Sequence, residues 1–184
     1  MTENGLEPGD NAISFTLPNA NPKFGGDTVS LEDINEKNGI IVLFTCNHCP
    51  YVVGSKDRIS FLANYASENG IGFVAINSND AVKYPDDGWD PMIDISIRDE
   101  YSWPYLHDES QSVAASWGAE RTPEVYLMNS NLKIIYRGRI DDSPKNPQAV
   151  TSKDLDNAIS LMLNGEKIDI QRTQSIGCSV KWKI

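Results

Sequence analysis

The chain has 184 residues, with 26 acidic and 16 basic side chains and a formal net charge of −10. That length fits one domain with a substantial core, and the excess of acidic groups argues against nucleic acid or an anionic membrane as the main partner. The N-terminus lacks the basic and apolar regions of a signal peptide, and no apolar run reaches the roughly 20 residues that span a bilayer, so we expect a cytoplasmic protein. Three cysteines are too few for a disulfide scaffold.

The first half of the chain predicts strands that alternate with helices. An edge strand ends at Pro18, and a short strand at Thr28–Leu31 leads into a polar helical turn. Residues 39–45, GIIVLFT, are apolar and largely β-branched, which favours a central strand buried on both faces. Apolar positions within 52–65 recur at helical spacing, and Gly70 ends that helix.

The second half continues the alternation and closes with a hairpin. The predicted elements are, in order, a buried strand in 71–80, a helix with Asp90 as N-cap and Pro91 at its first position, a short strand in 104–110, a short helix that ends near Gly118, a β-hairpin with its turn at Asn129–Asn131, and an amphipathic helix that ends at Gly165. Buried strands that alternate with helices predict an α/β protein with helices on both faces of the sheet, and the hairpin makes that sheet mixed.

Cys46 and Cys49 stand where the central strand ends and a helix begins. Open α/β sheets present functional groups at this edge, and the free N–H groups and positive dipole end of a helix stabilise a thiolate there. His48 adds a cation or hydrogen-bond donor beside both sulfurs, and Pro50 fits the first helical turn. In this arrangement we expect Cys46 to attack a substrate disulfide and Cys49 to resolve the mixed disulfide.

Three segments carry a resemblance to a known family: LFTCNHCPY at 43–51, ERTPEVYL at 120–127 and YRGRIDD at 136–142. Together they resemble the thioredoxin fold superfamily in its redoxin branch, which includes the peroxiredoxins (the alkyl hydroperoxide reductase/thiol-specific antioxidant group) and thioredoxin-like reductases. The resemblance implies a single thioredoxin-like domain over 1–184, with an N-terminal β extension and with a C-terminal tail, 166–184, outside the common core.

The resemblance also assigns roles to Thr122 and Pro123. Pro123 matches the family's cis-proline, which lies opposite the active cysteines and shapes the substrate surface. The backbone of Thr122 would then pair with an extended substrate chain by strand addition. A plain proline at the start of a strand is the alternative.

The peroxiredoxin pattern is incomplete in this chain. Those enzymes hold the peroxide with a threonine three residues before the reactive cysteine, where this sequence has Cys46 before Cys49 and Leu43 before Cys46. They also place an arginine at about the position of Pro123, and Arg121 is two residues away. A peroxidase activity is therefore less favoured than disulfide exchange.

Cys178 and the charged residues leave alternatives open. Cys178 is either a third redox thiol, brought near the pair by a folded-back tail, or a small buried residue, since free cysteine is among the most buried residue types. Glu124 follows the proline and faces either toward the cysteines, as a proton acceptor, or away from them. The remaining charged positions are expected to form surface salt bridges; they are Arg137, Arg139, Asp141 and Asp142.

A zinc site would use the three cysteines and one histidine. Only one C-x-x-C pair occurs, so we expect no bound metal. Stoichiometric zinc in protein prepared without chelator would overturn the redox interpretation.

The sequence thus predicts a thiol–disulfide oxidoreductase with an antioxidant or protein-disulfide role. Cys46 and Cys49 form the couple, His48 tunes it, and Thr122 and Pro123 frame the substrate groove. The partners would be a protein or small-molecule disulfide, or a hydroperoxide, and an external thiol reductant such as a thioredoxin or glutathione system, with no cofactor. A thiol peroxidase and a redox-inactive binding module are the alternatives. A histidine before the second cysteine resembles strongly oxidising members of the superfamily. We therefore predict a couple that is less reducing than thioredoxin, whose reduction potential is about −270 mV.

Overall fold

A five-stranded mixed sheet forms the centre of the computed structural model, which describes residues 5–184. The strand order is β5-β4-β3-β7-β8. The strands β3, β4 and β5 are parallel, whereas β7 runs antiparallel to both β3 and β8. Their bounds are β3 Ile40–Thr45, β4 Gly72–Asn77, β5 Tyr105–His107, β7 Glu124–Met128 and β8 Ile134–Gly138. The predicted central strand, its parallel neighbour and the closing hairpin are therefore confirmed.

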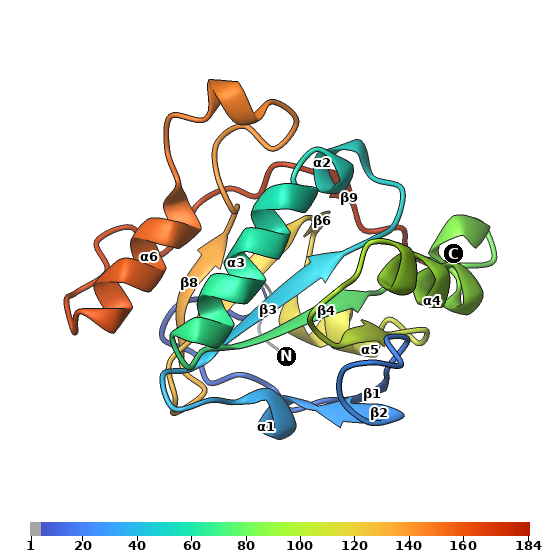
Figure 1. The fold of residues 1–184 in the computed structure, drawn as a ribbon, viewed down its shortest axis with the longest axis horizontal. Helices are drawn as coiled ribbons and strands as arrows, with labels where there is room; N and C mark the ends of the chain where they lie inside the picture. The colour runs from blue at the N-terminus through green and yellow to red at the C-terminus, as the bar shows by residue number, and fades with distance from the viewer. Residues whose placement is uncertain (1–4) are drawn as a thin grey trace.

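Two apolar cores lie on opposite faces of this sheet because strand side chains alternate. In β3, Ile41 and Leu43 enter one core, while Val42 and Phe44 enter the other. The first core is covered by α3, α4 and α6, and the second by α5 and the N-terminal segment (Figure 1). The helix bounds are α3 Lys56–Glu68, α4 Trp89–Arg98, α5 Ser112–Trp117 and α6 Asp154–Leu163. Helices on both faces were expected from the sequence, and the structure confirms them.

The predicted N-terminal β extension is a two-stranded antiparallel pair of β1 (Thr16–Pro18) and β2 (Thr28–Ser30). The second strand ends one residue earlier than the sequence predicts. Ser30 forms a capping box with Asp33, so Leu31 becomes the first residue of the short helix α1, Leu31–Ile34.

The helix after the cysteines is broken in two, whereas the sequence predicts one continuous helix. The first piece is α2, Pro50–Val53, and α3 begins at Lys56. Between them, a Cβ on Gly54 would lie 2.7 Å from the carbonyl oxygen of Pro144. The Ser55 hydroxyl donates to that same oxygen and to Tyr51 O. Contact with the loop at Pro144 therefore fixes the break.

The predicted start of α4 is also wrong, by two residues. Gly88 is the N-cap and Trp89 the first helical residue, instead of Asp90 and Pro91. A short 3-10 turn, η1 at Pro85–Asp87, directly precedes Gly88. Pro91 still lies in the first turn, where a helix has no intrahelical use for an N–H group, so its missing donor costs nothing.

The tail at 166–184 crosses back over the strand that precedes Pro123. Its strand β9, Cys178–Ser179, pairs antiparallel with β6, Arg121–Thr122. A second 3-10 turn, η2 at Pro147–Ala149, precedes α6. Among residues 5–184, no helix combines the length and the apolar character needed to cross a membrane.

Candidate active site

The thiols of Cys46 and Cys49 meet at the end of β3. Cys46 follows the strand directly, and Cys49 is the N-cap of α2, with Pro50 in the first turn. Both are free thiols, and the Cys46 thiol is a hydrogen-bond donor to the Cys49 sulfur. Only 3% of Cys46 and 1% of Cys49 is exposed. The predicted proximity of the two sulfurs is present, but neither opens freely to solvent.

The surroundings stabilise a thiolate at Cys49. The hydrogen bond from Cys46 is the largest of the effects that lower the pKa of Cys49 to about 4, and the thiol and N–H of Cys178 and the N–H of Val52 add to it against the cost of burial. The same Cys46–Cys49 bond raises the pKa of Cys46, as do burial and the negative charge of Asp87. The sequence predicts Cys46 as the nucleophile, whereas this geometry favours Cys49, because Cys49 rather than Cys46 occupies the helix N-cap.

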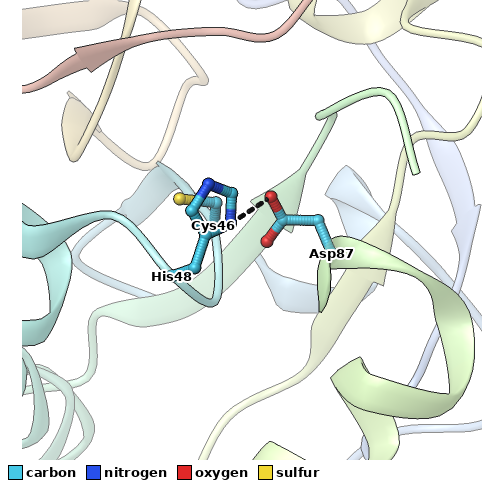
Figure 2. Close-up of side chains that lie close together, drawn as sticks. All are labelled: Cys46, His48 and Asp87. Atoms are coloured by element: carbon cyan, nitrogen blue, oxygen red, sulfur yellow. Dashed lines mark ion pairs between the residues drawn. The ribbon is translucent and has the colours of Figure 1, made fainter. Parts of the chain in front are cut away.

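A buried carboxylate that the sequence does not reveal lies on the other side of Cys46. Asp87 is fully buried, and Oδ2 of its carboxylate is 2.8 Å from His48 Nδ1 (Figure 2). His48 is about one third exposed and its ring stacks on Tyr84 at 5.9 Å between centroids. A ligand atom of Cys46, one of His48 and one of Asp87 all lie within 4.8 Å of one another. His48 thus lies between solvent and a buried charge, beside the Cys46 thiol.

Amide donors hold the Asp87 carboxylate in place. The backbone N–H of Asn47 donates to Oδ1 at 2.7 Å, and Nδ2 of Asn79 donates to Oδ2 at 2.8 Å. Asp87 comes from the loop between β4 and α4, about forty residues from the cysteines, and no local motif marks it. Only the acidic run at 86–87 before the helix start could have drawn attention to it.

A metal ion would find three donor atoms in the cluster of Cys46, His48 and Asp87. A closed zinc site has four, and the oxygens of Asp87 already accept hydrogen bonds from Asn47, Asn79 and His48. The zinc site considered from the sequence would use three cysteines and a histidine. The cluster in the structure differs from that ligand set, because His48 turns toward Asp87.

The Thr122–Pro123 peptide bond is cis, as the resemblance implies. Thr122 faces both cysteines: its Oγ1 lies 3.4 Å from Cys46 Sγ, and its carbonyl oxygen lies 3.3 Å from Cys49 Sγ, from which it accepts a hydrogen bond when Cys49 is protonated. The backbone edge that the sequence assigns to substrate is occupied by the chain itself, since Thr122 pairs with Cys178. A Cβ on Gly177 would lie 2.1 Å from Thr122 O, so glycine is what allows this close approach.

Glu124 and Arg137 form a buried ion pair away from the cysteines. Glu124 Oε1 accepts from Arg137 Nε at 2.9 Å, and its Oε2 accepts from the backbone N–H groups of Glu120 and Arg121. Glu124 therefore does not serve the cysteines as a proton acceptor. The expectation of a surface salt bridge is wrong for Arg137, whose side chain is 0% exposed. Its strand β8 lies beneath the N-terminal segment, which also supplies Leu6 O and Glu7 as acceptors.

Comparisons with known proteins identify the family and the fold of the chain. The sequence matches the Redoxin family over residues 7–159. An uncharacterized conserved protein from Geobacillus kaustophilus is 39% identical with a TM-score of 0.89, over 98% of this chain and 94% of that chain. The hypothetical protein SMc02350 from Sinorhizobium meliloti is 34% identical with a TM-score of 0.88, over 98% and 97%.

A more distant structure shares the fold alone. It is peroxidoxin BcpB from Mycobacterium tuberculosis, 17% identical with a TM-score of 0.60, over 87% of this chain and 97% of that chain. No protein with a curated description matches the sequence significantly.

Proposed function

Because the chain belongs to the redoxin family and has its thioredoxin-like fold, we propose that it is a thiol–disulfide oxidoreductase that cycles between the Cys46–Cys49 dithiol and disulfide. One observation carries the proposal. The sulfurs of Cys46 and Cys49 lie together at the start of a helix, and both face Thr122, the residue before a cis-proline.

The exchange needs two sulfurs and two protons. The Cys49 thiolate attacks a substrate disulfide RS–SR′, forms a Cys49–SR mixed disulfide and releases R′S⁻, which takes up a proton. The Cys46 thiolate then attacks the Cys49 sulfur, forms the Cys46–Cys49 disulfide and releases RS⁻, which is protonated in turn. Overall, one substrate disulfide is reduced to two thiols and one protein dithiol is oxidised.

His48 and Asp87 serve the second attack in this proposal. Cys46 must lose its proton before it can attack, and the negative charge of Asp87 alone would oppose that loss. The His48 imidazole is close enough to take the proton, and the Asp87 carboxylate stabilises the imidazolium that results. Thr122 and Pro123 shape the surface beside the sulfurs, and electrons return from an external thiol such as a thioredoxin or glutathione system.

The stabilised Cys49 thiolate also supports an oxidising couple. Stabilising the reduced form raises the reduction potential. We therefore expect a potential higher than that of thioredoxin, which is about −270 mV. Equilibration with glutathione redox buffers measures it, and a value at or below that of thioredoxin would contradict the expectation.

Disulfide mapping of single variants tests the proposal. Mild oxidation of the wild-type protein should give a Cys46–Cys49 disulfide, whereas Cys46→Ser should be unable to form it, because the resolving sulfur is absent. Cys49→Ser should lower the rate of disulfide exchange at least about a thousandfold, because it removes the nucleophile. Failure of the wild-type pair to oxidise would favour a redox-inactive binding module.

A thiol peroxidase is the second candidate, because Cys49 combines a pKa of about 4 with a neighbouring third thiol. In this case Cys49 would be oxidised to a sulfenic acid by a hydroperoxide and resolved by a second cysteine. Rapid hydroperoxide turnover that survives Cys46→Ser but not Cys49→Ser would favour the peroxidase over disulfide exchange.

A further inference from the structure

The C-terminal strand brings a third thiol onto the active pair. In the β6–β9 register Cys178 lies opposite Thr122, the residue before the cis-proline. Both the thiol and the backbone N–H of Cys178 are directed at the Cys49 sulfur. Cys49 therefore touches two other thiols, Cys46 on the side of its own loop and Cys178 on the side of the tail.

The three thiols differ in their access to solvent. Cys46 and Cys49 are 3% and 1% exposed, whereas Cys178 is only partly buried. All three lie among the described residues. A large reductant or substrate that approaches the molecule in this form meets Cys178 first, and the sulfurs of the couple lie beneath it.

Hydrogen bonds on both sides hold Cys178 in this position. Before it, the Gly177 carbonyl accepts from Arg121 Nη1 at 2.9 Å. After it, Lys181 N–H donates to Asn79 Oδ1 at 2.9 Å and Lys181 O accepts from Gln111 Nε2 at 2.8 Å. Val180 between these anchors is 4% exposed. The tail is thus part of the folded site, and its thiol stays beside Cys49.

We propose that Cys178 is a relay thiol through which the buried Cys46–Cys49 couple exchanges electrons with external thiols, by way of a Cys49–Cys178 disulfide. The inference rests on the proposed disulfide exchange and adds a third participant to it. The relay also explains why β9 pairs with the backbone of Thr122, which the resemblance assigns to an extended substrate chain. Strand β9 carries the sulfur that the external partner meets.

Each step is a simple exchange in which one S–S bond replaces another. In the oxidised protein the Cys178 thiolate attacks the Cys49 sulfur, forms the Cys49–Cys178 disulfide and releases the Cys46 thiolate, which is protonated. An external thiol RSH, as its thiolate, attacks the Cys178 sulfur, forms RS–S–Cys178 and releases the Cys49 thiolate. A second RSH frees the Cys178 thiol and leaves as RS–SR. Two external thiols are oxidised, and one protein disulfide is reduced.

Oxidation of the pair itself prepares Cys178 for the first step. Burial raises the pKa of Cys178, and so do its hydrogen bond to Cys49 and the charge of the Cys49 thiolate, while Lys181 and Arg121 lower it. Once Cys49 is part of a disulfide it carries no charge, so the two contributions of Cys49 disappear and the cationic side chains remain. Cys178 is then more readily ionised when it is required to attack.

Peptide mapping after oxidation tests whether the Cys49–Cys178 bond forms. Trypsin would leave Cys46 and Cys49 together in residues 38–56 and Cys178 in residues 173–181. In Cys46→Ser, oxidation with glutathione disulfide and acid quenching should link these two peptides. A Cys49–glutathione adduct with a free Cys178 as the stable product would overturn the relay.

The rate of reduction provides a second, independent test. Oxidised Cys178→Ser should retain the Cys46–Cys49 disulfide but be reduced by glutathione at least about tenfold more slowly than wild type, because the attacked sulfur is then buried. The exposed neighbour Ser179→Ala is the matched control and should be reduced at the wild-type rate. Circular dichroism confirms that each variant is folded.

The two proposals fail in different ways. If the wild-type protein forms no Cys46–Cys49 disulfide, the proposed function is wrong. If that disulfide forms and Cys178→Ser is reduced as fast as wild type, the couple stands and the relay is wrong.

Discussion

One buried carboxylate lies beside the active cysteines and another lies away from them, and the two differ in what neutralises them. Asp87 and Glu124 are 0% and 1% exposed. Glu124 lies next to Pro123 and is paired with Arg137, a guanidinium that stays charged and is itself buried. Asp87 is paired with His48, an imidazole that reaches solvent and can accept or release a proton.

This difference separates a structural charge pair from one suited to proton transfer. The Glu124–Arg137 pair is buried at both members and anchors β7 to β8 and to the N-terminal segment through Leu6 and Glu7. The Asp87–His48 pair joins the loop of the cysteines to the loop after β4 and can change its charge during a reaction. We therefore expect changes at Glu124 to alter stability, and changes at Asp87 or His48 to alter the chemistry of Cys46.

Glu124→Gln should produce the largest effect on stability. Removing one member of a buried ion pair leaves the other charge uncompensated, which typically costs about 3–5 kcal/mol of unfolding free energy. Denaturant unfolding of the reduced protein measures the loss. Where the variant is folded, Cys49 should still react with iodoacetamide at low pH as in wild type.

Glu7→Gln is the matched control for that experiment, because Glu7 binds the same guanidinium but is 39% exposed. An exposed partner of this kind contributes about 1 kcal/mol or less. Equal losses from Glu124→Gln and Glu7→Gln would show that burial does not set the strength of the Glu124 contact.

Asp87→Asn should cost less stability and change the thiols. The amide keeps one oxygen for either Asn47 or Asn79 but turns an NH₂ group toward the other donor, at a cost of about 1–3 kcal/mol. Since the Asp87 charge helps to raise the pKa of Cys46, its removal should lower that pKa. Thiolate absorbance, followed against pH in a Cys49→Ser/Cys178→Ser background, reports Cys46 alone. An unchanged Cys46 titration would contradict the assigned electrostatic role of Asp87.

The pH dependence of stability should reveal the Cys49 thiolate. Its pKa falls from an ordinary value of 9.0 to about 4 in the folded protein. Between these values the unfolded chain binds a proton that the folded chain does not, so the stability of the reduced protein rises with pH. The slope is at most about 1.4 kcal/mol per pH unit, and the stabilisation is lost as pH falls toward 4.

Unfolding at pH 5 and at pH 7 measures that slope, with the oxidised protein as the control because its Cys49 cannot titrate. Parallel changes in the reduced and oxidised forms would mean that Cys49 is protonated in the native state.

The sequence reveals the features that depend on neighbouring residues. The apolar run before Cys46, the C-x-x-C spacing and the Thr122–Pro123 dipeptide each carry a local signal, and they predicted the sheet, the junction of strand and helix, and the proximity of the two sulfurs. The continuous apolar run from Ile40 to Phe44 likewise predicted a strand that is buried on both faces.

The features that the sequence missed depend on contacts between distant segments. Asp87 reaches His48 only because η1 folds over the end of β4. For Cys178 the sequence left two alternatives, and the register of β9 on β6 places it beside the pair. The choice between Cys46 and Cys49 as the nucleophile stays a prediction for the single-cysteine variants to decide, because it depends on which residue becomes the N-cap and on which groups face each sulfur. No spacing rule fixes these contacts.

His48→Gln should have the smallest effect on stability and a clear effect on rate. The His48 ring is about one third exposed, so its contact with Asp87 should contribute less than about 1 kcal/mol to unfolding, while the amide donors still hold the carboxylate. If the imidazole takes the proton of Cys46, the resolving step should slow by about a hundredfold, in the range of general base catalysis. Rapid quenching of the mixed disulfide measures that step, and Asp87→Asn should slow it as well. The contrary outcome is a resolving rate that is unchanged in His48→Gln but reduced in Asp87→Asn. It would mean that the carboxylate acts on Cys46 through its charge alone and that the imidazole takes no part in the proton transfer.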